Sequence, residues 1–189
     1  MKPFLKNDID IFKNLTEAEF NELKSVFFYR KYLKKEFIIK ENSAVQHIYF
    51  ISSGLVKLSY FDNDANEFIL SFAFENWWET DFSAFYHQTK ATLTLQCLED
   101  TEVYSLSFDD YFLILNKYRL SDYFLDKSIR GHIASQKRIL SLLTLNPRQR
   151  YEQFLQVYPS LGQRVPKSAL ALYLGVSRET LSRLYKAKR

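Results

Sequence analysis

The sequence predicts an α+β protein, with an antiparallel β-domain followed by a long helix and a small helical domain. Three observations support this fold class. Short runs rich in β-branched and aromatic residues fill the first half of the chain, helical periodicity governs the second half, and the last part is strongly basic. Aromatic residues make up 17% of the 189 residues, and such side chains favour pleated, half-buried surfaces.

The first helix is predicted from a capping box at Thr16. Its hydroxyl can accept from the amide of Glu19, whose carboxylate can reach back to the cap. Phe20, Leu23 and Phe27 then recur at helical spacing. These features predict a short helix over residues 17–27.

The strands are predicted from short runs of β-branched and aromatic residues separated by turn residues. Turns are expected at Ser53-Gly54 and over residues 62–66, Asp-Asn-Asp-Ala-Asn. Short strands at this spacing are typical of an antiparallel sandwich or barrel. We expect strands at 37–40, 48–51, 55–61, 67–73, 93–98 and 102–106.

Two helices are expected after the strands. Ser107 can cap a short helix that runs to about Lys117, and a longer one follows near residues 120–144. The long helix carries a narrow stripe at steps of three and four residues, which suits a two-helix seam between protomers. The alternative is that this helix packs on its own β-domain. The stripe consists of Leu125, Ile129, Ile133, Gln136, Leu140 and Leu143.

A domain boundary is expected at Asn146-Pro147, a good cap followed by a good first helical residue. A helix near 147–158 and a loop at 159–162 should follow. Residues 166–173 and 177–186 then form two helices, joined by a turn at Gly175. The expected inward positions of this pair are Leu170, Ala171, Leu174, Val176, Leu181 and Leu184.

The second helix of this pair exposes polar and charged side chains that can read DNA. In a helix-turn-helix, the start of the second helix points at base edges in the major groove. Arginine can bind guanine in a bidentate way, and a carboxylate can accept from cytosine. The alternative is that Glu179 and Arg183 form only a surface pair, four residues apart. The expected DNA-binding residues are Ser177, Arg178, Glu179, Ser182 and Arg183.

Charge distribution favours the DNA-binding interpretation. Residues 145–189 contain nine basic and two acidic residues and so carry +7, although the whole chain carries only +4. The other 144 residues therefore carry −3. A basic block beside an acidic body is typical of a polyanion-binding module. A solvated charged surface is the alternative explanation.

Other classes of protein receive little support. Cys97 is the single cysteine, and the three histidines have no ligand spacing, so we expect no metal site and no cofactor. We find no nucleophile–base pair and no phosphate loop, so we expect no catalytic residues and no enzyme activity. No apolar run approaches the roughly 18 residues of a membrane span, and the N-terminus lacks a signal peptide. A cytoplasmic protein with no membrane partner is expected.

Three segments resemble one family of bacterial regulators. Gly175–Arg183 resembles the recognition segment of the cyclic-AMP receptor protein / fumarate–nitrate regulator (Crp/Fnr) family. Ile48–Leu58 looks like that family's β-roll hairpin, and Leu98–Val103 looks like its later strand pair. Together these segments extend the resemblance over nearly the whole chain. In that family, the residues matching Arg178, Glu179 and Arg183 read bases.

The resemblance implies a division of the chain into three parts. Residues 1–118 would form a jelly-roll-like, cyclic-nucleotide-binding-type β-roll with flanking helices. Residues 119–145 would form a dimerisation helix, and residues 146–189 a winged helix-turn-helix. Only Arg189 follows the recognition helix region, so we expect the wing hairpin to be shortened or missing.

The predicted effector pocket departs from the family pattern. The family's Gly-Glu pair for ribose falls at Thr80-Asp81, and its Arg-Ser pair for the cyclic phosphate falls at Ala91-Thr92. Ala91 cannot pair with a phosphate, and Lys90 should point to the other face of its strand. We therefore expect weak or no cyclic AMP binding. With Trp78 crowding the loop, the pocket either accepts an uncharged or aromatic effector or is filled by aromatic core.

The resulting functional prediction is a homodimeric transcription regulator that binds a near-palindromic DNA site. RNA polymerase is a possible partner, and the effector is unidentified or absent. The alternative is a sensor of small molecules or proteins that keeps this fold without binding DNA. An exposed Arg178/Arg183 surface favours the regulator, because a pure sensor has no use for it.

Overall fold

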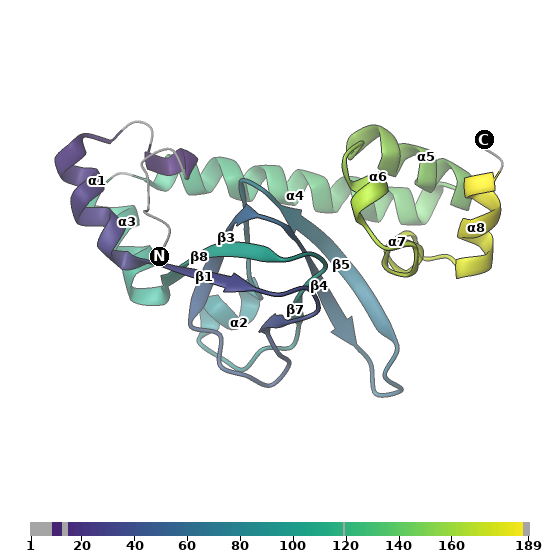
Figure 1. The fold of residues 1–189 in the computed structure, drawn as a ribbon, viewed down its shortest axis with the longest axis horizontal. Helices are drawn as coiled ribbons and strands as arrows, with labels where there is room; N and C mark the ends of the chain where they lie inside the picture. The colour runs from purple at the N-terminus through teal and green to yellow at the C-terminus, as the bar shows by residue number, and fades with distance from the viewer. Residues whose placement is uncertain (1–8, 13–14, 119, 187–189) are drawn as a thin grey trace.

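The computed structural model describes residues 9–12, 15–118 and 120–186 as a β-roll with helices at both ends and a long helix alongside (Figure 1). All strand pairs are antiparallel and form two four-stranded sheets, ordered β1-β8-β3-β6 and β2-β7-β4-β5. The predicted α+β class and antiparallel sandwich are confirmed. The strands are β1 (Phe27–Tyr32), β2 (Phe37–Ile39), β3 (His47–Ser53), β4 (Leu55–Phe61), β5 (Glu67–Phe74), β6 (Trp77–Glu79), β7 (Thr94–Cys97) and β8 (Thr101–Ser107).

Most of the helices lie at the two ends of the molecule (Figure 1). Helix α4 lies along the β-roll, with α1 and α3 near its start and the last four helices gathered near its end (Figure 1). Short 3-10 turns occur at Asp10–Phe12 and Lys24–Val26. The helices are α1 (Glu17–Leu23), α2 (Phe82–His87), α3 (Phe108–Lys117), α4 (Ser121–Thr144), α5 (Pro147–Val157), α6 (Leu161–Arg164), α7 (Lys167–Leu174) and α8 (Arg178–Lys186).

An aromatic core joins the β-roll to α4. The Trp78 ring lies 5.3 Å from both the Phe50 ring and the Phe124 ring, measured between centroids. The Trp78 indole also donates to the Tyr123 hydroxyl at 3.0 Å. Buried aromatic pairs of this kind stabilise by more than the area they remove from water. Part of α4 therefore packs on its own β-domain, as the alternative reading of the sequence expected.

The first helix is shorter than predicted. The capping box is present, since Glu19 N donates to the Thr16 hydroxyl and Thr16 N donates to the Glu19 carboxylate. However, α1 ends at Leu23, and the predicted continuation to Phe27 is wrong. Phe27 instead begins β1, which pairs with β8 along its whole length. The spacing of apolar residues within a segment cannot predict this pairing, because β8 lies about 75 residues further along the chain.

Strand β6 and helices α2 and α6 were also absent from the prediction. Strand β6 pairs with β3, and its three residues are too few to show a period. Helix α6 replaces part of the loop predicted at 159–162, because Leu161 is buried among the C-terminal helices. No helix in the described part of the chain is long and apolar enough to cross a membrane.

Candidate functional site

Helices α7 and α8 form a helix-turn-helix whose turn is built by Gly175. This glycine has φ of +64°, a conformation that favours a residue without a side chain. The next amide, of Val176, donates to the carbonyl of Ala171 at 3.0 Å and closes the end of α7. The Ser177 hydroxyl accepts from the amide of Thr180 at 3.1 Å and caps α8. The local chemistry of the turn thus sets the start of α8.

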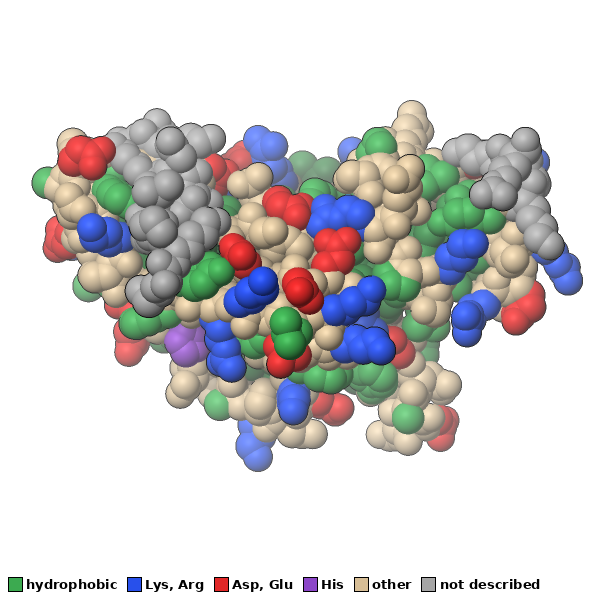
Figure 2. Space-filling model, viewed as in Figure 1, with side chains coloured by type: hydrophobic (Ala, Val, Ile, Leu, Met, Phe, Trp, Pro, Cys, Tyr) green, Lys and Arg blue, Asp and Glu red, His purple; other side chains and the backbone are tan. Residues whose placement is uncertain are grey.

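The predicted DNA-binding residues lie together on the exposed side of α8. Leu170, Ala171 and Leu181 are buried between the helices, which turns the polar side of α8 outward. In the space-filling view, basic side chains with one acidic neighbour occupy the surface over α8 (Figure 2). All five predicted residues are exposed: Ser177, Arg178, Glu179, Ser182 and Arg183.

Glu179 is electrostatically coupled to its neighbours on this surface. Hydrogen bonds from its own amide and from the Ser177 hydroxyl lower the pKa of its carboxyl, and the charges of Arg178 and Arg183 lower it further. Among the described ion pairs, Glu179 and Arg183 do not appear within 4 Å of each other. Both side chains therefore remain available to a ligand.

Aromatic packing attaches the C-terminal helices to the β-roll. The Phe72 ring on β5 lies 4.9 Å from the Tyr173 ring on α7, and the Phe74 ring lies 6.4 Å from that of Tyr158. Arg138 of α4 joins the same contact, donating from one nitrogen to the carbonyls of Ile69 at 2.7 Å and Tyr173 at 3.0 Å. Three elements, α4, β5 and α7, therefore meet at Arg138.

A second contact between the β-roll and the C-terminal helices is ionic. Arg164 of α6 binds the Glu75 carboxylate through two nitrogens, each at 2.9 Å, and the Glu99 carboxylate at 2.7 Å. It also donates to the carbonyl of Gly54 at 3.0 Å. Oppositely charged side chains lie against each other on the surface between the sheets and the C-terminal helices (Figure 2). We refer to Arg164, Glu75 and Glu99 as the Arg164 clamp.

The predicted effector-pocket residues have internal partners in this structure. The Asp81 carboxylate caps α2 by accepting from the amide of Ala84 at 3.1 Å. It also accepts from the amide and hydroxyl of Thr92 at 2.9 and 3.2 Å, and from the amide of Leu93 at 3.0 Å. The Thr80 hydroxyl donates to the carbonyl of His47 at 2.9 Å. Thr80 and Asp81 are buried, so their polar atoms stabilise the fold locally.

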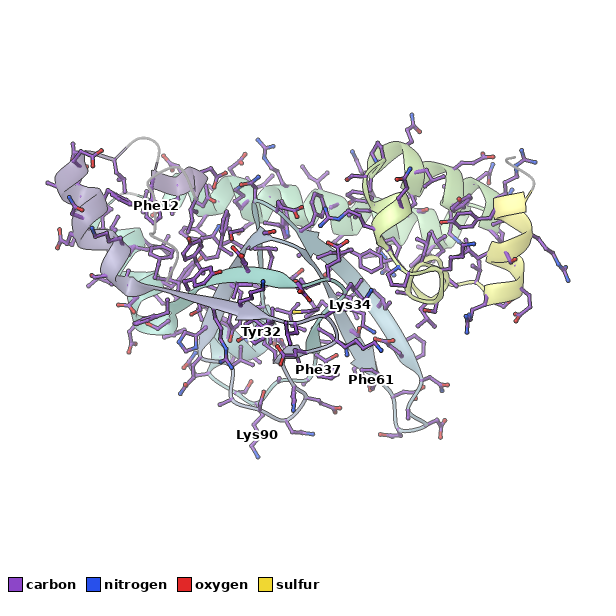
Figure 3. All side chains as sticks on the ribbon, viewed as in Figure 1. Phe12, Tyr32, Lys34, Phe37, Phe61 and Lys90 are labelled. Carbon is purple, nitrogen blue, oxygen red and sulfur yellow. The ribbon has the colours of Figure 1, made fainter. Side chains whose placement is uncertain are left out.

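The remaining predicted pocket residues differ in burial and in direction. Ala91 is buried, Thr92 is exposed, and Trp78 is directed to Tyr123. Lys90 extends away from the β-roll into solvent (Figure 3). These residues offer no cation to a bound phosphate.

A cavity of about 630 Å³ lies between the β-roll, α4 and the C-terminal helices, and of the predicted pocket residues only Trp78 lines it. The acidic residue in the lining of this cavity is Glu79, which the sequence analysis did not identify. Burial raises the pKa of Glu79 to about 7, although the Ser71 hydroxyl and the Thr80 amide both donate to it. The sequence did carry one sign of this residue: Glu79 directly follows Trp77 and Trp78 in an aromatic run. An acidic residue in such a run is unusual, because buried carboxylates are uncommon. Other lining residues include Phe72, Tyr111, Phe124, His132 and Arg138.

The predicted seam of α4 is open to solvent in the single chain. Leu125 is 58% exposed, Ile133 43% and Leu143 77%. Apolar side chains repeated at this spacing seldom stay in water along a whole helix. The described residues contain no group of three His, Cys, Asp or Glu side chains that could hold a metal ion.

The β-roll can now be compared with known domains. Two four-stranded antiparallel sheets form a roll, and a long helix lies beside it with a cavity between the roll, this helix and the C-terminal helices. Residues 29–118 match the cyclic nucleotide-binding domain. This match covers β1 to α3 and leaves the long helix and the helix-turn-helix outside. A comparison with curated proteins finds no match.

Solved structures with a similar fold extend the likeness beyond residues 29–118 to the C-terminal helices. CLP of Xanthomonas campestris, a c-di-GMP-responsive global regulator, is 16% identical, with a TM-score of 0.72 over 91% of both chains. FixK2 of Bradyrhizobium japonicum is 16% identical, with a TM-score of 0.75 over 86% of this chain and 84% of that one. A protein of Eubacterium rectale, described as a crp/fnr-family transcriptional regulator, is 14% identical, with a TM-score of 0.74 over 96% and 87%. At these identities, the likeness is one of fold.

Proposed function

We propose that this chain is a homodimeric, sequence-specific DNA-binding transcription regulator of the Crp/Fnr type. The observation that carries the proposal is the exposed polar side of α8 on a well-packed helix-turn-helix. All five side chains are exposed, Ser177 caps α8 and bonds the Glu179 carboxylate, and among the described residues no ion pair to another element engages Arg178, Glu179 or Arg183. The similar fold of CLP and FixK2 supports the same assignment.

The charge of the C-terminal segment supports binding to a polyanion. Each phosphate neutralised on duplex DNA releases condensed counterions, so binding should weaken steeply as salt rises. We infer that α8 enters the major groove and that Arg183 contacts a base edge while other basic residues contact phosphates. On this proposal residues 146–189 act as the DNA-binding domain.

Selection of bound fragments from a random DNA pool by the purified protein tests the proposal. We expect an enriched near-palindrome whose half-sites lie about 34 Å apart. Arg183→Ala should then weaken binding to the selected site by about 1–3 kcal/mol and relax the preference at one base pair. Arg30→Ala on β1 removes the same charge from the β-roll and should change little.

Two outcomes would contradict this picture. If Arg183→Ala weakens all sequences equally, Arg183 is a phosphate contact and does not read bases. If the protein enriches no sequence, with or without cell extract, the chain is a sensor of the same fold that does not bind DNA.

We further propose that any effector of this regulator is a compound other than cyclic AMP. A buried cyclic phosphate needs a cation or aligned amides, and Ala91 supplies only a methyl group where the family pattern has an arginine. Asp81 is held by Thr92 and Leu93 and is therefore engaged at the place where the pattern expects a ribose contact. The cavity beside Glu79 is the proposed effector pocket; without an effector, DNA binding would be constitutive.

A further inference from the structure

A second, smaller pocket lies where α4 meets the C-terminal helices. Its volume is about 260 Å³, and its walls come from α4, α5 and α7. It therefore borders the junction at which the chain turns from α4 into α5. The pocket adjoins the larger cavity, since Arg130, Ala134, Arg138, Tyr158 and Tyr173 line both, but Lys137, Arg150 and Phe154 line only the smaller pocket.

The lining of this pocket combines positive charge with apolar surface. Four basic side chains contribute to it, and no acidic residue does so among the described residues. The basic residues are Arg130, Lys137, Arg138 and Arg150. The apolar and aromatic part includes Leu142, Phe154, Val157, Tyr158, Tyr173 and Leu174.

Two of the guanidinium groups are incompletely satisfied. The Nε atoms of Arg138 and Arg150 are buried without a hydrogen-bond partner in the structure. Hydrogen bonds from their other nitrogens go to neutral carbonyls, those of Ile69 and Tyr173 for Arg138 and that of Leu145 for Arg150. Carbonyl oxygens accept hydrogen bonds without neutralising a charge. Burial accordingly lowers the pKa of Arg138, the direction expected for a cation without a nearby anion.

The pocket is accessible in the proposed dimer. At about 100° per residue, the α4 residues that line it are centred about 130° around the helix from the seam residues. Ile133 belongs to both sets, at their common border. A second copy seated on the seam would therefore leave most of the pocket open.

We propose that this pocket binds a small aromatic carboxylate, held by Arg138 and Arg150. A carboxylate can accept paired hydrogen bonds from a guanidinium and supply the missing negative charge. The aromatic walls suit a planar ring, and a cavity of about 150 Å³ in another protein already holds benzene. The volume here allows a single ring with its acidic group. The inference goes beyond DNA recognition and does not depend on it.

Calorimetric titration of the full chain with benzoate and with benzamide tests the proposal. The two compounds have the same shape and differ in charge. We expect benzoate to bind saturably, with a dissociation constant on the order of 1 mM or tighter, and benzamide at least about tenfold more weakly. Arg150→Gln should weaken benzoate binding about tenfold or more. Arg148→Gln, on the same helix but outside the pocket and bonded to Glu152, should leave it unchanged.

Three results would overturn the proposal: equal binding of benzoate and benzamide, unchanged benzoate binding in Arg150→Gln, or no saturable benzoate binding. The comparison of the two compounds uses only the unmodified protein, so it stands even if Arg150→Gln fails to fold. Because binding is measured without DNA, a negative result here says nothing against the proposed regulator function.

Discussion

The Arg164 clamp should contribute measurably to the stability of the folded chain. Arg164 binds two carboxylates, both from the β-roll, and a backbone carbonyl, so it ties α6 to three points. Its side chain is 25% exposed, and those of Glu75 and Glu99 are 36% and 32% exposed. Fully exposed ion pairs contribute about 0–1 kcal/mol, while breaking a buried pair costs about 3–5 kcal/mol. With partial screening, the Arg164–Glu99 coupling should be about 1.5 kcal/mol.

A double-mutant cycle with Arg164→Gln and Glu99→Gln, followed by urea unfolding, measures this coupling. The chain supplies a matched control in Arg148 and Glu152. That pair makes one hydrogen bond of 2.9 Å within α5, with side chains 71% and 52% exposed. Its cycle should give no more than about 0.5 kcal/mol. If both cycles give the same coupling, multiple partners and partial burial do not strengthen the clamp, and the reasoning fails.

The pH dependence of the clamp follows from Glu75. Partial burial raises the pKa of this carboxyl, but the hydrogen bonds from Arg164 and from the Gly54 amide outweigh burial, so the net pKa is lowered. A lowered folded-state pKa means that the stabilisation is present above the unfolded pKa of about 4.3 and is lost as pH falls through the lower folded value. The difference in unfolding free energy between the wild type and Arg164→Gln should therefore shrink below about pH 4. A difference that grows with acidity would contradict this assignment.

Three further perturbations test other parts of the structure. Gly54→Ala should destabilise the fold by about 2 kcal/mol or more, because φ is +105° and the new Cβ would lie 2.6 Å from the Thr101 hydroxyl. The control, Gly131→Ala within α4, meets its nearest neighbour at 3.6 Å and should be neutral or stabilising; equal thermal shifts for the two variants would refute the argument. Because the folded pKa of Glu79 is raised to about 7, its contribution is fully present below the unfolded pKa of about 4.3 and is lost as pH rises through 7. Glu79→Gln should therefore remove a decline of about 3 kcal/mol in unfolding free energy between pH 4.5 and 7.5, and an unchanged urea-midpoint profile would show that Glu79 is ionised at little cost. Ile133→Asp would place charge in the proposed α4 seam and should yield monomers by sedimentation. A variant that remains dimeric would place the dimer interface elsewhere.

Local sequence patterns predicted the elements whose stability is decided nearby. The capping box at Thr16 and the hydroxyl cap at Ser177 each use partners within three residues. The glycine at position 175 predicted a turn, and its φ is positive in the structure. The predicted strand at 55–61 forms β4 with the predicted bounds. For the same reason, the α8 surface was readable in advance, because a helix period alone separates its buried side from its exposed side.

Tertiary packing decided the features that depend on distant partners. Residues 27–32 form β1 because each of them pairs with a residue of β8. The spacing of residues within 17–32 does not indicate this pairing. Asp81 occupies the position expected to contact ribose, but Thr92 and Leu93 engage its carboxylate, from segments that only the folded roll brings together.

The candidate binding sites also differ in whether the sequence alone could predict them. The sequence by itself determined the fold class, the helix-turn-helix and its five exposed residues, because each follows from periodicity, capping and turn chemistry over short distances. Only the tertiary structure could bury Glu79 in the wall of a cavity and place Arg164 between two carboxylates and Arg138 at the meeting of α4, β5 and α7. The physical reason is that burial and charge pairing are set by neighbours far apart in the chain, and their effect on a side chain appears only when folding removes water from between them.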